Sequence, residues 1–349
     1  MADPTAAPAS RPLDTRFTRA FGLQTPIALA PMALASGGAL ASACAHAGAL
    51  GLVGGGYGEL AWTQREYTLA LASTLAGSAA RSRIGCGFIT WRLDQDASAL
   101  DWVLDHGPQD RPAALMLSFG DASRHARRVL DARIPLLLQV QRVEEVARAV
   151  DIGASVVIVQ GGEAGGHGMQ SLLARGTFTL VPEAADWLAA HSPQTLLLAA
   201  GGVADGRTLA AACVLGADGA LVGSRLWATQ ESLAAKGAKA LAAATSGDGT
   251  ARSAVFDILR RKNWPAPYDF RAVRNALHRQ WEQRIDALRA DPAAARAEYD
   301  AGVAAGDFAR AHATVGEATG LIHDVPDAAS VLARLHAQAA ERLGGRAGP

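Results

Sequence analysis

The chain has 349 residues, of which half are hydrophobic and 19% are charged, and its 33 Lys and Arg are balanced by 33 Asp and Glu. A net charge of zero argues against nucleic acid or an anionic membrane as the main partner. The apolar content is sufficient for a large core and excludes a disordered polymer.

The N-terminal segment, residues 1–20, lacks an apolar stretch behind a basic start, so it is predicted to be a disordered leader and not a secretory signal. The uncharged segment from Phe21 to Tyr57 is long enough to raise the question of a membrane span. Pro26 and Pro31 interrupt any continuous apolar helix there. We therefore expect no transmembrane segment.

Short apolar runs alternate with helical patterns from Pro26 to Ser224, which is typical of βαβ units and a parallel sheet. The expected strands are residues 27–30, 50–53, 84–89, 113–118, 135–140, 156–160, 196–200 and 220–222. The expected helices are residues 38–47, 98–105, 122–131, 143–150, 182–191 and 207–215. This count predicts a (β/α)8 TIM barrel over residues 21–224. A doubly wound open sheet is the alternative, because a sequence does not show closure.

Beyond Ser224 the sequence becomes rich in Ala, Arg and Glu, and no further strand is expected. Residues 225–325 are predicted to form a helical lobe over the barrel mouth, with one helix over 271–290. Residues 326–349 are predicted to be a helix that returns to the barrel, followed by a tail. The basic run 260–262 is interpreted as a solvated helix end because the total charge is neutral. The lobe could equally serve as a lid or as the interface of a homo-oligomer.

Three cysteines, odd in number and far apart in the sequence, argue against a disulfide framework. This indicates a reducing, cytoplasmic compartment. No H-x-x-x-H pattern or carboxylate cluster points to a metal, so no metal site is predicted.

The strongest functional signal is the segment QGGEAGGHG, residues 160–168, at the end of an expected strand. In a barrel this end is the catalytic face. The glycines let the backbone pass beside a flat ligand, and the Gln160 carboxamide can both donate to and accept from the edge of a heterocycle. His167 is the candidate general base, or the donor to an anionic substrate. Other histidines, His312 among them, lie on predicted helices and are expected to be structural.

Two further strand ends carry small residues, in the segments AAGGVADG and ADGALVGSR. They follow the last two strands of the predicted barrel, which is the usual phosphate site of this fold. The backbone N–H groups that could surround a dianion are those of Gly201, Gly202, Gly223 and Ser224. Met32, in Ala-Pro-Met after the first strand, lies at the same face, although Met is more often core filler than a ligand contact.

Together these segments resemble the nitronate monooxygenase family, formerly called 2-nitropropane dioxygenases, which are FMN enzymes on a TIM barrel. The resemblance is carried by residues 30–32, 47–51, 160–167, 200–206, 215–219 and 223–225, and near the C-terminus by 316–322. It implies that the isoalloxazine is lined by Met32, Gln160, Gly165 and Gly166. It implies that the FMN phosphate is held by Gly201, Gly202, Gly223 and Ser224, and that His167 is catalytic.

The implied reaction is the oxidation of an alkyl nitronate with O2 to a carbonyl compound and nitrite, and the use of neutral nitroalkanes is left open. The chain departs from the family pattern at two positions. Gly87, with Thr90 nearby, stands where many members have Asn, and Ser118 stands where some have a second His. Two alternatives remain: a flavin-dependent enoyl-acyl carrier protein reductase that uses NAD(P)H, and a catalytically silent barrel that binds FMN or phosphate.

Overall fold

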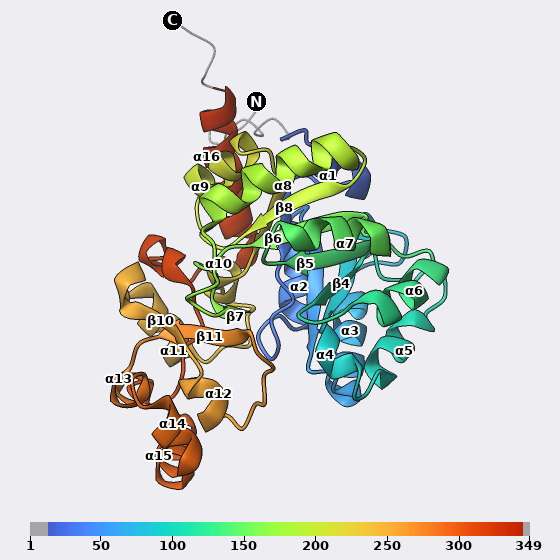
Figure 1. The fold of residues 1–349 in the computed structure, drawn as a ribbon. Coiled ribbons are helices and arrows are strands. Elements are labelled where there is room, and N and C mark those ends of the chain that lie inside the picture. The colour runs from blue at the N-terminus through green and yellow to red at the C-terminus, as the bar shows by residue number, and fades with distance from the viewer. Residues whose placement is uncertain (1–12, 345–349) are drawn as a thin grey trace, which may run out of the picture.

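Eight parallel strands form the sheet at the centre of the structure, a computed structural model that describes residues 13–344 (Figure 1). They are β1 (Ile27–Leu29), β2 (Gly51–Gly56), β3 (Ile84–Ile89), β4 (Leu115–Ser118), β5 (Leu136–Val140), β6 (Val156–Gln160), β8 (Leu196–Ala200) and β9 (Gly219–Val222). Their order is β1-β9-β8-β6-β5-β4-β3-β2, and backbone hydrogen bonds between Leu50 and β1 join the two ends. The predicted TIM barrel is confirmed, and all eight expected strands are present.

Helices connect successive strands on the outside of the barrel (Figure 1). They are α2 (Gly38–His46), α3 (Leu60–Ala72), α4 (Thr90–Leu93), α5 (Ser98–Leu104), α6 (Ser123–Asp131), α7 (Glu144–Ile152), α8 (Thr177–His191) and α9 (Gly206–Val214), and α10 (Ser224–Trp227) follows the last barrel strand. The expected helices all occur, but α3 and the four-residue helices α4 and α10 were not predicted, and α8 begins at Thr177 and contains Pro182 within its second turn. Asp205 begins α9 by a reciprocal capping box with Thr208.

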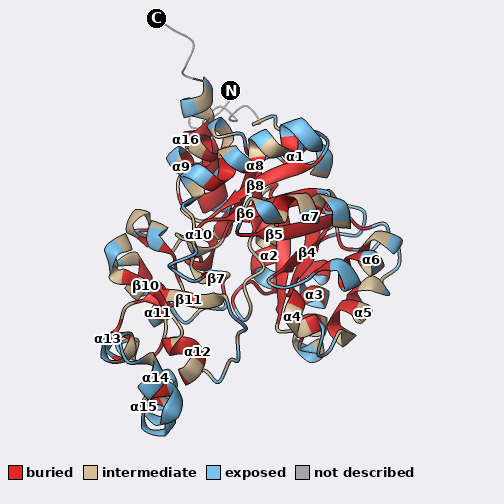
Figure 2. Ribbon diagram, in the orientation of Figure 1, coloured by how far each residue is buried: buried red, intermediate tan, exposed pale blue. Residues whose placement is uncertain are grey.

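The barrel is filled by its own side chains. Leu50, Leu52 and Leu137 belong to a cluster inside the ring of strands, whereas Val53 and Leu138 belong to the cluster between strands and helices. Burial on both faces explains why the strands are continuous apolar runs, and Figure 2 shows them as buried along their length. A ligand must therefore bind at an end of the barrel and not along its axis.

A second, antiparallel sheet joins the barrel to the lobe. Its strands are β7 (Gly166–Met169), which follows β6, and β10 (Thr250–Ser253) and β11 (Tyr268–Val273) of the lobe, in the order β10-β11-β7. The expectation of a lobe without strands is wrong, and so is the helix over 271–290, where β11 is followed by α13 (Ala276–Trp281) and α14 (Ile285–Ala290). The partner of β11 lies about a hundred residues earlier, so local patterning does not reveal the pairing.

The rest of the lobe is helical, with α11 (Lys236–Ala243), α12 (Val255–Leu259), α15 (Ala293–Ala305) and three-residue and five-residue 3₁₀ turns at Gly247–Gly249 and Glu317–Leu321. The C-terminal helix α16 (Ala328–Gly344) packs against α9 and α2. The division of the chain at residues 224 and 325 stays a prediction. Among residues 13–344, no helix is both long and apolar enough to cross a bilayer.

The leader is shorter than predicted. Residues 16–20 belong to α1 (Arg16–Phe21), so a disordered segment that extends to residue 20 is wrong, and residues 1–12 lie outside the described part. Phe17 is fully buried, and Arg16 forms two hydrogen bonds of 2.7 Å with Asp218. The buried Phe17 ring, the Arg16–Asp218 ion pair and the Thr15 capping box hold this helix, and none of them stands out in composition.

Candidate active site

A cavity of about 790 Å³ lies at the carboxyl ends of the barrel strands, between the barrel and the lobe. It brings together all nine residues that the sequence singled out: Met32, Gln160, Gly165, Gly166, His167, Gly201, Gly202, Gly223 and Ser224. These residues come from the ends of β1, β6, β8 and β9 and from β7. Their roles stay predictions, whereas their convergence on one cavity is a property of the fold.

The strand-end glycines differ in what surrounds them. A Cβ built on Gly202 would meet nothing within 4 Å, and one on Gly223 would come no closer than 3.7 Å to another residue, so open space lies beside both. At Gly165 a Cβ would meet the backbone of Val315 and Gly316 at 2.5 Å. Gly165 is therefore required for close packing of two backbone segments, while Gly202 and Gly223 leave room for a ligand.

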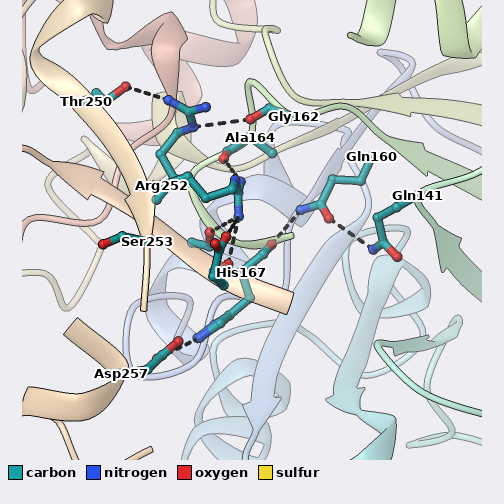
Figure 3. Close-up of polar contacts among 12 residues, drawn as sticks. Gln141, Gln160, Gly162, Ala164, His167, Thr250, Arg252, Ser253 and Asp257 are labelled. Carbon is teal, nitrogen blue, oxygen red and sulfur yellow. Dashed lines mark hydrogen bonds and ion pairs between the residues drawn. The ribbon is translucent and has the colours of Figure 1, made fainter. Parts of the chain in front are cut away.

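Gln160 has its carboxamide largely occupied within the protein (Figure 3). Its Oε1 accepts hydrogen bonds of 3.2 and 3.1 Å from Gln139 and Gln141, and its Nε2 donates to the His167 carbonyl at 3.0 Å. One N–H of the carboxamide is left for a ligand. Gln160 thus fixes the backbone at His167 in addition to lining the cavity.

His167 lies on β7 directly opposite Phe270 of β11. Its Nε2 is 2.9 Å from Oδ1 of Asp257, a residue of α12 (Figure 3). Its ring stacks on Trp264 with centroids 3.4 Å apart and planes inclined by 12°, and the Phe270 centroid is 4.7 Å away. The imidazole is therefore held on one edge by a carboxylate and on one face by an aromatic ring.

The burial of His167 determines its charge. Desolvation lowers the pKa of His167 to about 4, because it outweighs the hydrogen bond and the negative charge of Asp257, which raise the pKa. The ring is neutral at pH 7. A carboxylate at Nε2 selects the tautomer with the proton on that nitrogen, so the lone pair is on Nδ1. The sequence suggested two roles for His167, a general base or a donor to an anionic substrate. A neutral imidazole suits the general base, and it provides no positive charge for an anion.

Arg252 holds the glycine-rich segment against the lobe (Figure 3). Its side chain is 1% exposed, and its guanidinium donates to the carbonyls of Ala164 at 2.8 Å, Gly166 at 3.2 Å and Asp269 at 2.7 Å. Burial lowers the pKa of Arg252 to about 10, so it still carries its charge at neutral pH. These hydrogen bonds span β7, β11 and the segment before β7.

Arg252→Met is expected to lower the free energy of unfolding by about 3 kcal/mol, because it leaves buried carbonyls and Asp269 without their donor. Urea unfolding followed by tryptophan fluorescence measures this change. The control is Arg279→Met, which removes the same charge from an exposed position of the lobe. Equal unfolding midpoints for the two variants would show that Arg252 is dispensable.

The chain matches known proteins over most of its length. A family model described as nitronate monooxygenase matches residues 98–337. The chain is 33% identical to a nitronate monooxygenase (npaC) of Metarhizium robertsii, over 89% of each chain, and 30% identical to a nitronate monooxygenase of Neurospora crassa, over 90% of this chain and 89% of that one. The chain belongs to the nitronate monooxygenase family. It is an oxidoreductase, and membership implies a flavin cofactor.

Solved structures share the fold of this chain. FabK from Thermotoga maritima has a TM-score of 0.77 and 22% identity, covering 95% of this chain and 98% of its own. A nitroalkane oxidase from Streptomyces ansochromogenes has a TM-score of 0.72 and 24% identity, covering 93% and 98%. At these identities the likeness establishes the barrel with its lobe and does not discriminate between activities.

The two departures from the nitronate monooxygenase pattern have different surroundings. At Gly87 a Cβ would meet the Pro31 ring at 2.4 Å, so the Asn found in many members does not fit here. Ser118 lines the cavity at the end of β4, 7% exposed.

The sequence did not point to several residues of the candidate site. Trp264, Arg260, Tyr299 and His312 line the cavity from the lobe, and Asp257 supports His167. His312, expected to be structural, has its Nδ1 2.6 Å from the Tyr299 hydroxyl, and burial lowers its pKa to about 3. Their signals in the sequence are the Trp-Pro-Ala-Pro segment at 264–267 and the basic run at 260–262.

Proposed function

We propose that this chain is a cytoplasmic FMN enzyme that oxidises alkyl nitronates with O2 to a carbonyl compound and nitrite. The observation that carries the proposal is the His167–Asp257 pair in a cavity that also contains the glycine-lined ends of β8 and β9. Family membership supports nitronate oxidation. The cytoplasmic location is supported by three free cysteines, Cys44, Cys86 and Cys213.

The residues of the cavity fit a flavin mononucleotide. The open space beside Gly202 and Gly223, which follow β8 and β9, would receive the phosphate. The Ser224 hydroxyl accepts a hydrogen bond from the Gly316 N–H at 2.9 Å, so its own hydrogen is free to donate. The ring system would lie along Met32, Gly166 and the free N–H of Gln160. Bound FMN would supply the electron acceptor for the nitronate and the site of reaction with O2.

The protein's own part in the reaction is to take up the α-carbon proton of a neutral substrate and to bind the negatively charged nitronate. A nitronate has already lost that proton, so it needs no base. For a neutral nitroalkane, Nδ1 of His167 takes the proton from the α-carbon, the C–H electron pair moves to the nitro group, and the imidazolium is stabilised by Asp257. Trp264 covers one face of the imidazole and keeps water from it.

Anaerobic mixing of the purified, flavin-loaded protein with ethyl nitronate tests the proposal. We expect loss of the oxidised flavin absorbance, followed on admission of air by O2 uptake and nitrite release. A flavin that responds to NADH or NADPH but not to the nitronate would indicate a reductase. A flavin that responds to neither would indicate a silent binding barrel.

Asp257→Asn is expected to lower kcat for nitroethane by about 10² or more, because the amide can donate to Nε2 and so place the proton on Nδ1, where the lone pair is needed. The turnover of preformed ethyl nitronate should change far less, since that substrate gives up no proton. Steady-state oxygen uptake with the two substrates measures the difference. An equal loss with both substrates would contradict this role for Asp257.

A further inference from the structure

The substrate of the proposed reaction is an anion, and a fixed positive charge in the cavity would bind it. The basic run at 260–262 lines the cavity. Arg261 is half-exposed and paired with Asp300 at 2.7 Å. The Lys262 Nζ lies 4.1 Å above the centre of the Tyr57 ring. The prediction that this run is a solvated helix end therefore fails for at least one member, because the Arg260 side chain is only 14% exposed.

Arg260 is positioned beside His167 by a shared ring and a shared carboxylate. Its guanidinium lies 4.6 Å from the centre of the Phe270 ring, and the His167 ring centre is 4.7 Å from the same ring. Asp257 Oδ1, which bonds His167, is 3.9 Å from Arg260 Nη1, beyond hydrogen-bond distance. Among the described residues, buried Nη1 has no hydrogen-bond partner.

An unpartnered buried guanidinium N–H is costly, and Arg260 differs from the other arginines with such an atom in that it also lines the cavity beside His167. The charge of Arg260 also acts on the rest of the cavity wall. Burial lowers the pKa of His167 and of His312, and Arg260 lowers both further. Burial raises the pKa of Tyr57 and Tyr299, and Arg260 opposes that rise. Its field therefore reaches four groups that line the cavity, and it favours a negative charge there.

We propose that Arg260 is the anion-binding residue of the substrate site, and that its guanidinium holds the negatively charged nitro group of the nitronate beside His167. The proposal rests on the proposed function. It makes specificity a matter of charge: the anion gains a charged hydrogen bond that a neutral nitroalkane gains only weakly. Because an arginine stays protonated, this preference should not depend on pH in the neutral range.

The test is isothermal titration of the oxygen-free protein with ethyl nitronate and, separately, with nitroethane, after its flavin has been reduced with dithionite so that the nitronate is bound but not oxidised. Arg260→Gln is expected to weaken nitronate binding by about tenfold to a hundredfold, the scale of a hydrogen bond to a charged partner. Nitroethane binding should change by less than about twofold on the same scale. Arg279→Gln, which removes an exposed arginine of the lobe, is the control for net charge. Arg260→Lys should restore part of the preference.

Unchanged nitronate affinity in Arg260→Gln would overturn the proposal. If that variant does not fold, the pH dependence of nitronate binding by the wild type is the test. An affinity that is constant between about pH 6 and pH 9 supports arginine. An affinity that is lost as the pH rises through about 6.5 assigns the charge to a histidine and overturns the proposal for Arg260.

Nitrite release by the wild type separates this proposal from the proposed function. An anion preference that depends on Arg260 without any nitrite release keeps the binding site and rejects the function; nitrite release with an unaltered Arg260→Gln KM rejects only the binding site.

Discussion

His167→Asn is expected to retain its flavin and to lower kcat for a nitroalkane by about 10² or more, the usual contribution of a general base. Asn is smaller than His and lacks a basic nitrogen, so proton removal from the α-carbon loses its acceptor. The flavin should stay, because His167 lies on β7 and the predicted phosphate residues follow β8 and β9. Oxygen uptake and the flavin-to-protein ratio measure the two effects.

The pH dependence of wild-type activity is a second, independent test of His167 as the general base. The active form is the neutral imidazole, whose pKa is about 4. Activity with nitroalkanes should therefore be constant through neutral pH and fall as the pH drops through about 4, with no inflection near the ordinary histidine value of about 6.5. Unchanged kinetics in His167→Asn, or an inflection near 6.5 that the variant removes, would each contradict this description.

Gly202→Asp is expected to give colourless protein. The Cβ at this position points into open space, so the carboxylate would enter the region proposed for the FMN phosphate and repel it. Gly202 has φ of +79°, a conformation that most side chains avoid, and a loss of cofactor could therefore arise from backbone strain. Gly202→Asn separates the two causes, since Asn has the shape of Asp without its charge and tolerates this conformation.

The absorbance ratio of flavin to protein after purification, and again after incubation with FMN, is the measurement. Gly202→Asn should keep a substantial part of its flavin where Gly202→Asp keeps none. A yellow Gly202→Asp protein would place the phosphate elsewhere. Equal loss in both variants would attribute the effect to the backbone and leave the charge without a role.

The barrel could be predicted because each of its strands is buried on both faces and is therefore a short apolar run with a recognisable end. The sheet of β7, β10 and β11 could not. The sequence GHGM of β7 is typical of a loop, and it forms a strand because residues 268–271 of β11 pair with it. The same distance in sequence explains the failure over 271–290, where helix-forming residues such as Arg271 and Ala272 are paired in a strand.

The candidate site likewise has a part that the sequence predicts and a part that it does not. Residues at strand ends, such as Gly202 and Gly223, are predictable because all parallel strands end at one face of the barrel. Asp257 and Trp264 belong to the lobe, and nothing near them in the sequence indicates which barrel residue they meet. For the same reason the sequence does not show that His312 lines the cavity, where it pairs with Tyr299, and its structural role stays a prediction.

The pairing of β7 with β11 also determines how this enzyme can be divided. His167 is encoded with the barrel but is held in place by Asp257, Phe270 and Trp264 from the lobe. A recombinant exchange of the lobe between relatives at residue 224 would separate the histidine from its supports, while the ends of β8 and β9 would stay intact. The segments that must be exchanged together are discontinuous in the sequence. They are the segment after β6, which contains His167, and the lobe, without β8 and β9 between them.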